Sequence, residues 1–148
     1  MEENKYNCLK LSQQLCFPLY ACARETIKLY TPHLDKLGLT YTQYITMMVL
    51  WERKSLTAKE LGRILFLDSG TLTPMLKKME GKGLLTRKRS EMDERNLIVT
   101  ITDAGDALKD QALEIPEMMT RHINLETEEI AVLYRSLYKM LERAESGK

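Results

Sequence analysis

Cysteine is scarce in this sequence, with three residues in 148, and all three lie within the first 22 positions. Cys8, Cys16 and Cys22 are odd in number, crowded at one end of the chain, and not spaced like the CxxC pairs of zinc sites. A disulfide scaffold and a cysteine-based zinc centre are therefore excluded. We expect three free thiols, either inert or reactive.

Long apolar runs are absent as well. The longest, Ile45–Trp51, contains Thr46 and is far shorter than a membrane span. The first ten residues, MEENKYNCLK, are polar and lack the apolar centre of a signal peptide. We expect a cytoplasmic protein with no membrane partner.

The signatures of enzymes are missing too. The two histidines, His33 and His122, have no partners in the sequence that would form a catalytic triad or a metal site, and no glycine-rich loop could cradle a phosphate. The sequence therefore predicts neither an enzyme nor a metal or cofactor site.

The composition is that of an ordinary globular domain, with 44% hydrophobic and 29% charged residues, so we expect one domain. The net charge of +1 conceals an uneven distribution. Residues 77–89 hold six Lys or Arg against one Glu (+5), whereas residues 103–129 hold eight acids against two bases (−6). The acidic stretch is read as a solvated face, but a compact basic stretch is also typical of nucleic-acid binding.

Two helices are expected in the first third of the chain. The first runs from about Gln14 to Tyr30 and is closed by Thr31-Pro32. The second is capped by Thr40 or Thr42. Its apolar side consists of Tyr44, Met47, Met48 and Trp51.

The middle third predicts a winged helix-turn-helix. In LTAKELGRIL, Thr57 and Glu60 form a capping box and Leu61, Ile64 and Leu65 face inward. The next helix starts at Asp68, although Ser69, Thr71 and Thr73 are alternative caps and Pro74 favours a later start. Its apolar face is Leu72, Met75, Leu76 and Met79, and Gly81 or Gly83 ends it. Two β-rich runs, 84–89 and 96–101, flank a polar connection and predict a hairpin, the wing.

The last third predicts two more helices. One covers Asp103 to Met119, with a cap at Thr102 or Asp103 and a perturbation at Pro116. The other begins near Glu126 and carries an apolar stripe of Ile130, Leu133, Leu137, Met140 and Ala144. The stripe can complete a monomer core or form a dimer interface, and DNA operator symmetry favours the dimer.

The motif LCFPLY places Cys16 close to a helix start. Proline inside a helix costs about 3 kcal/mol but is tolerated in the first turn, so Pro18 favours a start near Gln14 or Leu15. Unpaired N–H groups and the helix dipole then favour a thiolate at Cys16. The alternative is a small buried hydrophobe, and Cys8 and Cys22 keep that interpretation.

The stretch LDSGTLTPMLKKMEGKGLLTRKRSEMDERNLIVTIT strongly resembles the recognition helix and wing of MarR-type transcription regulators. QLCFPLYACARETIKLY followed by LTYTQY is similar to the OhrR-like, peroxide-sensing branch of that family. The resemblance implies a mainly α fold with a small β-hairpin: one domain, 1–148, with dimerisation helices at about 10–35 and 103–146 and a winged helix-turn-helix at about 40–102. It also implies that Cys16 is the sensing cysteine of a homodimer. Its thiolate would be hydrogen-bonded by Tyr30 and Tyr41 of the partner subunit, with Tyr20 nearby.

The chain departs from the two-cysteine members of this branch, because it has no cysteine after Cys22. On a helix, Cys22 lies about 9 Å along the axis from Cys16, so a disulfide between them requires unwinding. The resemblance therefore points to the one-cysteine type, in which the sulfenic acid at Cys16 is trapped by a small cellular thiol or oxidised further.

For DNA, the expected partner is a pseudo-palindromic double-stranded operator. Ser69, Thr71 and Thr73 would make groove contacts and Lys77 a phosphate contact. The family's wing arginine falls on Arg95, which would enter the minor groove with Asp93 positioning it. The expected backbone contacts are Arg87, Lys88 and Arg89.

The resulting hypothesis is a repressor that releases its operator when Cys16 is oxidised by an organic hydroperoxide or a related oxidant. The alternative is a MarR-type repressor that binds a phenolic or drug-like molecule, with Cys16 structural. A thiol peroxidase is disfavoured because no resolving cysteine and no activating arginine-threonine motif is present.

Overall fold

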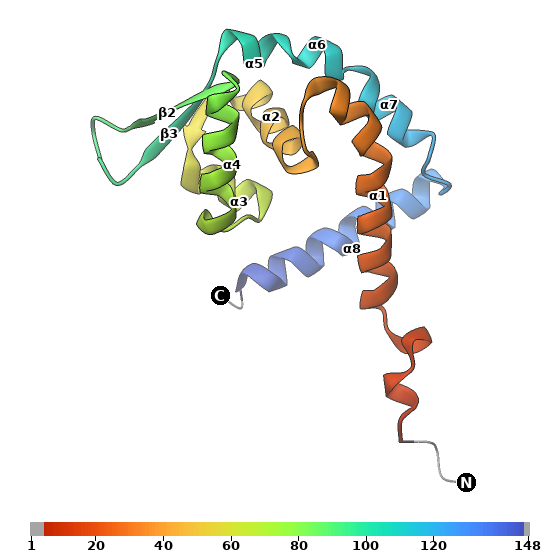
Figure 1. Ribbon diagram of the computed structural model, residues 1–148. Helices are drawn as coiled ribbons and strands as arrows, with labels where there is room; N and C mark the ends of the chain where they lie inside the picture. The colour runs from red at the N-terminus through yellow and green to blue at the C-terminus, as the bar shows by residue number, and fades with distance from the viewer. Residues whose placement is uncertain (1–4, 147–148) are drawn as a thin grey trace. The chain divides into compact units, whose positions relative to one another are not determined.

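The computed structural model describes residues 5–146 and divides the chain into two compact units, Met1–Ile115 and Pro116–Lys148. The first unit is mainly helical with one small antiparallel sheet, which confirms the predicted fold class (Figure 1). No helix among the described residues is long and apolar enough to cross a membrane.

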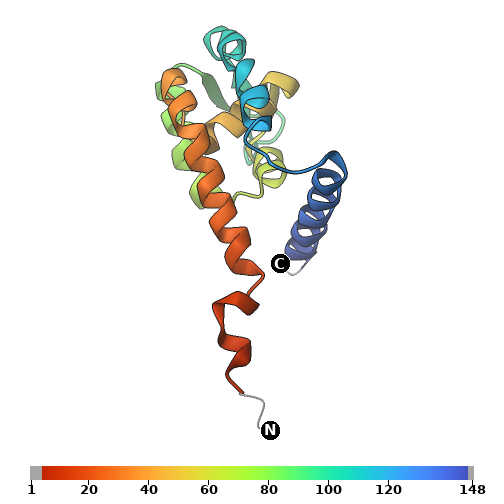
Figure 2. The same ribbon diagram turned by 90° about the vertical axis from the view of Figure 1, so that its right-hand side faces the viewer.

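Helix α1 (Cys16–Leu37) follows two short 3₁₀ turns and begins where LCFPLY predicts, with Pro18 in its first turn. The predicted end at Thr31-Pro32 is wrong: Pro32 lies inside the helix, which continues without interruption to Leu37 (Figure 2). The chain turns at Gly38, which has a left-handed φ of 66°, and Leu39 donates to the carbonyl of Leu34. Since Leu34 is almost fully buried, packing of this last turn offsets the bond that Pro32 cannot make.

Helix α2 (Tyr41–Arg53) is capped by Thr40, which forms a reciprocal capping box with Gln43. Of the predicted apolar side, Tyr44 and Met47 are buried and Trp51 is half-buried, but Met48 is exposed and its assignment to the core is wrong. The buried face is instead completed by Leu50 and Thr46.

Helix α3 (Ala58–Leu65) has the predicted Thr57–Glu60 capping box, and Leu61 is fully buried. Ile64 is exposed, contrary to the prediction. The buried arc is centred between Leu61 and Gly62, and at 100° per residue Ile64 points about 110° away from that centre.

Helix α4 (Ser69–Gly81) starts at the Asp68 cap, whose carboxylate accepts the N–H of Thr71 at 2.8 Å. Pro74 lies inside it, as the Asp68 start requires. All four predicted core positions are buried: Leu72, Met75, Leu76 and Met79. With Leu34, Met47, Leu50 and Leu61 they form the core against which the sheet packs.

The wing is confirmed as a hairpin of β2 (Leu85–Arg89) and β3 (Leu97–Ile101), which projects beside α4 (Figure 1). The sequence missed a third strand, β1 (Ser55–Thr57), which pairs with the other edge of β3 and gives the order β1-β3-β2. Three residues are too few for a periodic pattern to reveal a strand.

The predicted helix over Asp103 to Met119 is divided into α5 (Asp103–Ala107), α6 (Lys109–Ala112) and α7 (Glu114–Thr120). Thr102 caps α5. The joint residues Leu108 and Leu113 keep helical dihedrals, so the chain bends rather than turns back. Pro116 falls in the first turn of α7, where its missing N–H costs no helix bond, so the perturbation precedes it.

The second unit contains α8 (Thr127–Ser146), one residue after the predicted start. Along it, Ile130, Leu133 and Met140 are exposed and Leu137 is partly covered. The apolar stripe is thus present, and the second unit by itself does not bury it.

Candidate nucleic-acid interface and thiol site

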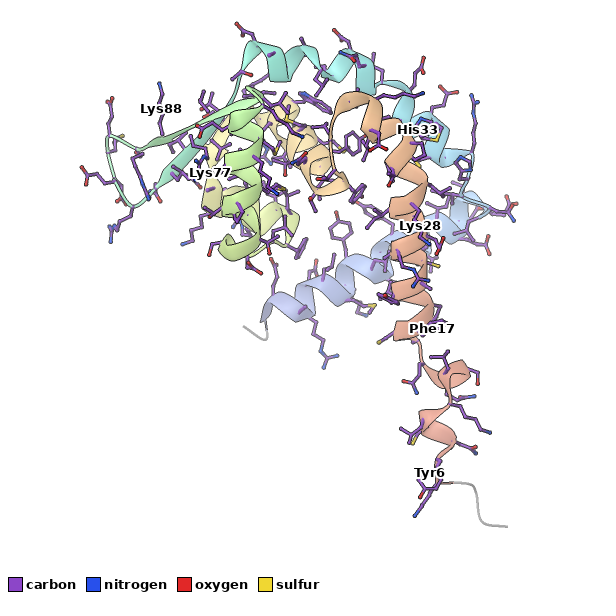
Figure 3. The ribbon with its side chains drawn as sticks, viewed as in Figure 1. Tyr6, Phe17, Lys28, His33, Lys77 and Lys88 are labelled. Atoms are coloured by element: carbon purple, nitrogen blue, oxygen red, sulfur yellow. The ribbon has the colours of Figure 1, made fainter. Side chains whose placement is uncertain are left out.

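The predicted DNA-contacting residues of α4 lie on its exposed side. Ser69, Thr71, Thr73 and Lys77 are all exposed, opposite the buried apolar face. Asp68 caps the helix and leaves these side chains pointing outward. Figure 3 shows Lys77 on α4 and Lys88 on the wing, the two elements that carry the basic stretch.

The tip of the wing is ordered by local hydrogen bonds. The N–H of Ser90 donates to the carbonyl of Asn96 at 2.8 Å, and Asn96 donates to the carbonyl of Asp93 at 2.9 Å. These bonds turn the chain between β2 and β3 and hold the tip in one shape. An ordered tip presents its side chains to a partner without the entropic cost of fixing the loop.

Arg95 extends from this tip. Its side chain is 90% exposed, and its Nε lies 3.1 Å from Oδ1 of Asp93, which also accepts the backbone N–H of Arg95 at 3.1 Å. Nη2 also donates to Oδ2 of Asp93 at 3.5 Å, so the carboxylate holds one edge of the guanidinium and leaves the other edge in solvent. This is the geometry predicted for Asp93 as the residue that positions Arg95, whose entry into a groove stays a prediction.

Arg87 is placed differently from its neighbours on the strand. Its guanidinium donates from Nε and Nη2 to Oε2 of Glu80, each at 3.1 Å, and its backbone N–H donates to Oε1 at 2.8 Å. The Arg87 side chain is only 20% exposed, whereas Lys88 and Arg89 are exposed. Arg87 thus ties β2 to the end of α4, and a phosphate would have to compete with Glu80 for it.

The Glu80–Arg87 pair is stronger at neutral than at acid pH. The backbone and side-chain hydrogen bonds from Arg87 hold the pKa of Glu80 below its usual value. A carboxyl whose pKa is lowered by folding adds stability above its unfolded pKa, and this stability is lost as the pH falls through the folded pKa. No feature of the sequence pointed to Glu80, because the pair joins two elements across the turn at Gly83.

Replacing Lys88 by glutamine should weaken DNA binding and flatten its salt dependence by about one unit, because one phosphate contact is lost. Arg87→Gln removes the same charge one residue away, but it should leave the salt slope unchanged and lower the melting temperature, since Glu80 then loses its partner. DNA titrations between about 50 and 200 mM salt, with thermal melts, measure both effects. Equal flattening in the two variants would place Arg87 on the phosphates instead.

Cys16 is the first residue of α1, and its side chain is exposed. The preceding residue, Leu15, provides no side-chain cap, and the first turn contains no acidic residue. Phe17 donates its N–H to the carbonyl of Gln14 and Pro18 has no N–H, so it is the dipole of α1, not offset by any carboxylate in the first turn, that favours an anion at this end. Cys8 and Cys22 are also exposed, and Cys22 lies on the same uninterrupted helix as Cys16.

The three predicted tyrosines separate into two groups. Tyr20 lies one turn after Cys16 on α1, with the guanidinium of Arg24 5.4 Å from its ring centre. Tyr30 lies 14 residues after Cys16, about 21 Å along the helix axis, and therefore cannot touch Cys16 of its own chain. Tyr41 stands with Tyr30, their ring centres 4.9 Å apart.

A third ring, Tyr44, completes this cluster at 5.9 Å from Tyr30. We call Tyr30, Tyr41 and Tyr44 the tyrosine cluster. Burial raises the pKa of all three, so the phenols stay protonated at neutral pH and can donate hydrogen bonds. The sequence placed Tyr44 only in the core; its spacing of three from Tyr41 was the signal that both face one side.

Among residues 5–146, no group of three or more potential ligands is placed to hold a metal ion. The chemistry that these residues offer consists of an exposed thiol at a helix start, a cluster of phenols, and basic side chains on a helix-turn-helix and its wing.

Known proteins with similar sequences and structures share these features. The family described as "Transcriptional regulator SarA/Rot" matches residues 28–112. The organic hydroperoxide resistance transcriptional regulator of Bacillus subtilis is 50% identical over 140 residues, covering 95% of each chain. Reduced AbfR bound to DNA has a TM-score of 0.77 at 34% identity and covers 92% of this chain and 95% of its own. AbfR, a protein of Staphylococcus epidermidis, is also known overoxidised on DNA and in a disulfide form.

A MarR variant from E. coli complexed with operator DNA has a TM-score of 0.78 at 25% identity and covers 86% of this chain and 93% of its own. The relatives named here are transcriptional regulators and not enzymes, which confirms that this chain is not an enzyme. The fold, the matched family and the high identity over nearly the whole length agree with the resemblance first seen in the recognition helix and wing. The chain belongs to the MarR family of transcriptional regulators, in its OhrR-like branch.

Proposed function

We propose that this protein is a dimeric repressor that releases its operator when Cys16 is oxidised by an organic hydroperoxide. The observation that carries the proposal is the position of Cys16, exposed at the uncapped start of α1. It is supported by the 50% identity to a regulator named for organic hydroperoxide resistance. In this proposal α4 enters the major groove of the operator and Arg95 enters the minor groove.

The chemistry begins with the thiolate of Cys16. It attacks one oxygen of the hydroperoxide, an S–O bond forms, the O–O bond breaks, and the departing alkoxide takes up a proton to leave as the alcohol. The sulfur is oxidised to sulfenic acid and the peroxide is reduced. A small cellular thiol then attacks the sulfenic sulfur and displaces water, which leaves a mixed disulfide on Cys16.

A small thiol is the resolving partner because the chain offers no suitable second cysteine. Cys22 is held about 9 Å further along the same helix, beyond the reach of a disulfide. Overoxidised AbfR is bound to DNA, so added oxygen atoms alone do not prevent that relative from binding. We therefore assign release in this protein to the bulkier mixed disulfide.

The geometry of the tyrosines supports the proposed dimer. Tyr30 and Tyr41 cannot reach Cys16 of their own chain, so hydrogen bonds from them to its thiolate need a second copy. In a two-fold dimer such a contact occurs twice, because Cys16 of each subunit then lies against the tyrosine cluster of the other. Among the residues that the structure describes, all but four of the exposed large hydrophobic side chains lie outside residues 40–102, the exceptions being Met48, Ile64, Phe66 and Met92. The terminal segments thus carry the apolar surface that a second copy would cover.

Oxidation changes what the tyrosine cluster can bind. A thiolate is a compact anion that accepts phenolic hydrogen bonds, whereas a mixed disulfide is larger and uncharged at sulfur. Loss of these bonds shifts the two subunits relative to each other, and two recognition helices must enter major grooves about one helical turn apart. A loss of about 1.4 kcal/mol in binding is already a tenfold release.

The test exposes parent, Cys16→Ser and Cys22→Ser proteins to an organic hydroperoxide with and without a small thiol. Operator binding is followed by fluorescence anisotropy and Cys16 by mass spectrometry. The parent and Cys22→Ser proteins should lose operator affinity by about tenfold or more when the thiol is present, whereas Cys16→Ser should bind throughout. Cys22 is a matched control because it is exposed on the same helix.

Two results would contradict the proposal: release of Cys16→Ser by the oxidant, or retention of the operator by a parent protein fully modified at Cys16. Insensitivity to oxidant combined with release by a phenolic compound would instead support a ligand-responsive repressor.

A further inference from the structure

One ammonium group joins three helix ends in the first unit. Lys82 is the residue at which α4 ends, and its Nζ donates to the carbonyl of Gly38 at 2.5 Å and to Oε1 of Gln43 at 3.2 Å. Gly38 is where α1 ends, and Gln43 lies in the first turn of α2. In the sequence, Lys82 was notable only as one of the six basic residues of the stretch 77–89.

The electrostatics of this position favour the ammonium. The carboxyl end of a helix carries a partial negative charge, and Lys82 lies at two such ends, that of α1 at Gly38 and that of α4 itself. The ammonium also supplies a hydrogen-bond donor for the amide oxygen of Gln43, a residue that is only 5% exposed. That oxygen accepts both the ammonium of Lys82 and the backbone N–H of Thr40. A buried amide oxygen with two donors is firmly held.

The hydrogen bonds of Lys82 lie next to the tyrosine cluster. Tyr41 is the first residue of α2 and lies between Thr40 and Gln43, the two members of the capping box that Lys82 binds. Its ring contacts Tyr30 on α1, only eight positions before Gly38. Tyr30 contacts Tyr41, the backbone joins Tyr41 to Thr40 and Gln43, and Gln43 accepts from Lys82, so these links run from α1 to the end of α4.

We propose that Lys82 is a positioning residue that couples the tyrosine cluster to the recognition helix α4. A shift of the first turn of α2 moves Oε1 of Gln43 relative to the carbonyl of Gly38, and in this proposal the end of α4 follows so that Lys82 keeps both acceptors. The proposal rests on the proposed function, since it assigns the route by which the state of Cys16 reaches the DNA-binding helix. A contiguous network supports such coupling only when both sites respond to it, so the test measures the coupling itself.

The experiment compares parent, Lys82→Met, Lys82→Arg and Lys78→Met proteins. For each, operator affinity is measured in the reduced state and after hydroperoxide with a small thiol, and mass spectrometry verifies equal modification of Cys16. The coupling is the ratio of the two dissociation constants. Lys78 is the matched control because it is an exposed lysine one turn earlier on α4.

Lys82→Met should become modified like the parent yet show a ratio smaller by about fivefold or more, because the oxidised protein keeps its operator. Lys82→Arg retains a donor and should restore most of the ratio, and Lys78→Met should keep the parent's ratio even if both of its affinities fall. A purely structural or charge effect lowers both affinities together and leaves the ratio unchanged. A second variant, Gln43→Met, removes the amide acceptor from the other side and should also reduce the ratio.

An unchanged ratio in Lys82→Met at equal Cys16 modification would overturn the proposal. Failure of the proposed function looks different, because the parent itself would then keep its operator after full modification; that result would overturn both.

Discussion

Replacing Leu137 by glutamate should turn the protein into a monomer and abolish operator binding in the same step. Leu137 is the centre of the apolar stripe on α8 and its most covered large member, while the second unit by itself leaves Ile130, Leu133 and Met140 exposed. An exposed stripe of this kind is stable in water only when a partner covers it. We hypothesise that this partner is a second copy.

The expected effect is large because a dimer would bury the substituted side chain twice. An unpaired carboxylate in an apolar interface costs several kcal/mol, and each 1.4 kcal/mol is a tenfold change in the dissociation constant. The dimer should therefore weaken by about a hundredfold or more, enough to leave monomers at micromolar concentration. Operator binding should fall with it, because a monomer presents one recognition helix to a two-fold site.

Lys139→Glu is the matched control, since it introduces the same glutamate into the same helix on the side away from the stripe. Light scattering and operator titration at micromolar protein measure both consequences. A dimeric Leu137→Glu protein, or a parent that is monomeric under these conditions, would show that the stripe serves another purpose.

Gly105→Ala should destabilise the fold by about 3 kcal/mol, which corresponds to roughly 6–12 °C in melting temperature for a domain of this size. A Cβ at this position would lie 2.1 Å from the carbonyl oxygen of Leu84 and 3.1 Å from the side chain of Ile101. The obstructing oxygen belongs to the backbone and accepts the N–H of Thr102, so it cannot move without breaking that bond.

Gly81→Ala is the control, because a Cβ there meets nothing within 4 Å and alanine favours the helix over glycine by up to about 1 kcal/mol. Its melting temperature should equal or exceed that of the parent. The lone tryptophan, Trp51, reports locally, since its indole N–H donates to the carbonyl of Gly105 at 2.9 Å. A Gly105→Ala protein with unchanged melting and unchanged tryptophan emission would contradict the close approach.

The features predicted correctly from sequence depend on residues close together in the chain. The caps at Thr40, Thr57 and Asp68 each bond a backbone N–H three residues later, so residue type and spacing identify Thr57 and place Thr40 and Asp68 among a few candidates. The start of α1 near Cys16 follows in the same way from Pro18, because a first turn is where a proline ring costs a helix least.

The end of α1 and the inner face of α3 were predicted wrongly because they depend on distant neighbours. Burial of Leu34 carries α1 through Pro32, and packing of α3 against α2, α4 and the sheet buries Leu61 and Gly62 while Ile64 stays exposed. Local propensity gives no information on either contact. The strand β1 is likewise defined by its pairing with β3, 40 residues later, and not by its own three residues.

The features of the candidate site fall into the same two groups, those set by nearby residues and those set by contacts between distant elements. From the sequence alone we could predict the family, the start of α1 near Cys16 and the exposed basic and hydroxyl side chains of α4, since motif, cap and periodicity are local properties. Only the tertiary structure showed that Arg87 is held by Glu80, that Tyr30 and Tyr41 meet, and that Lys82 joins three helix ends. These contacts unite elements separated by turns or by dozens of residues, and their geometry is set by how the helices pack and not by any spacing in the chain.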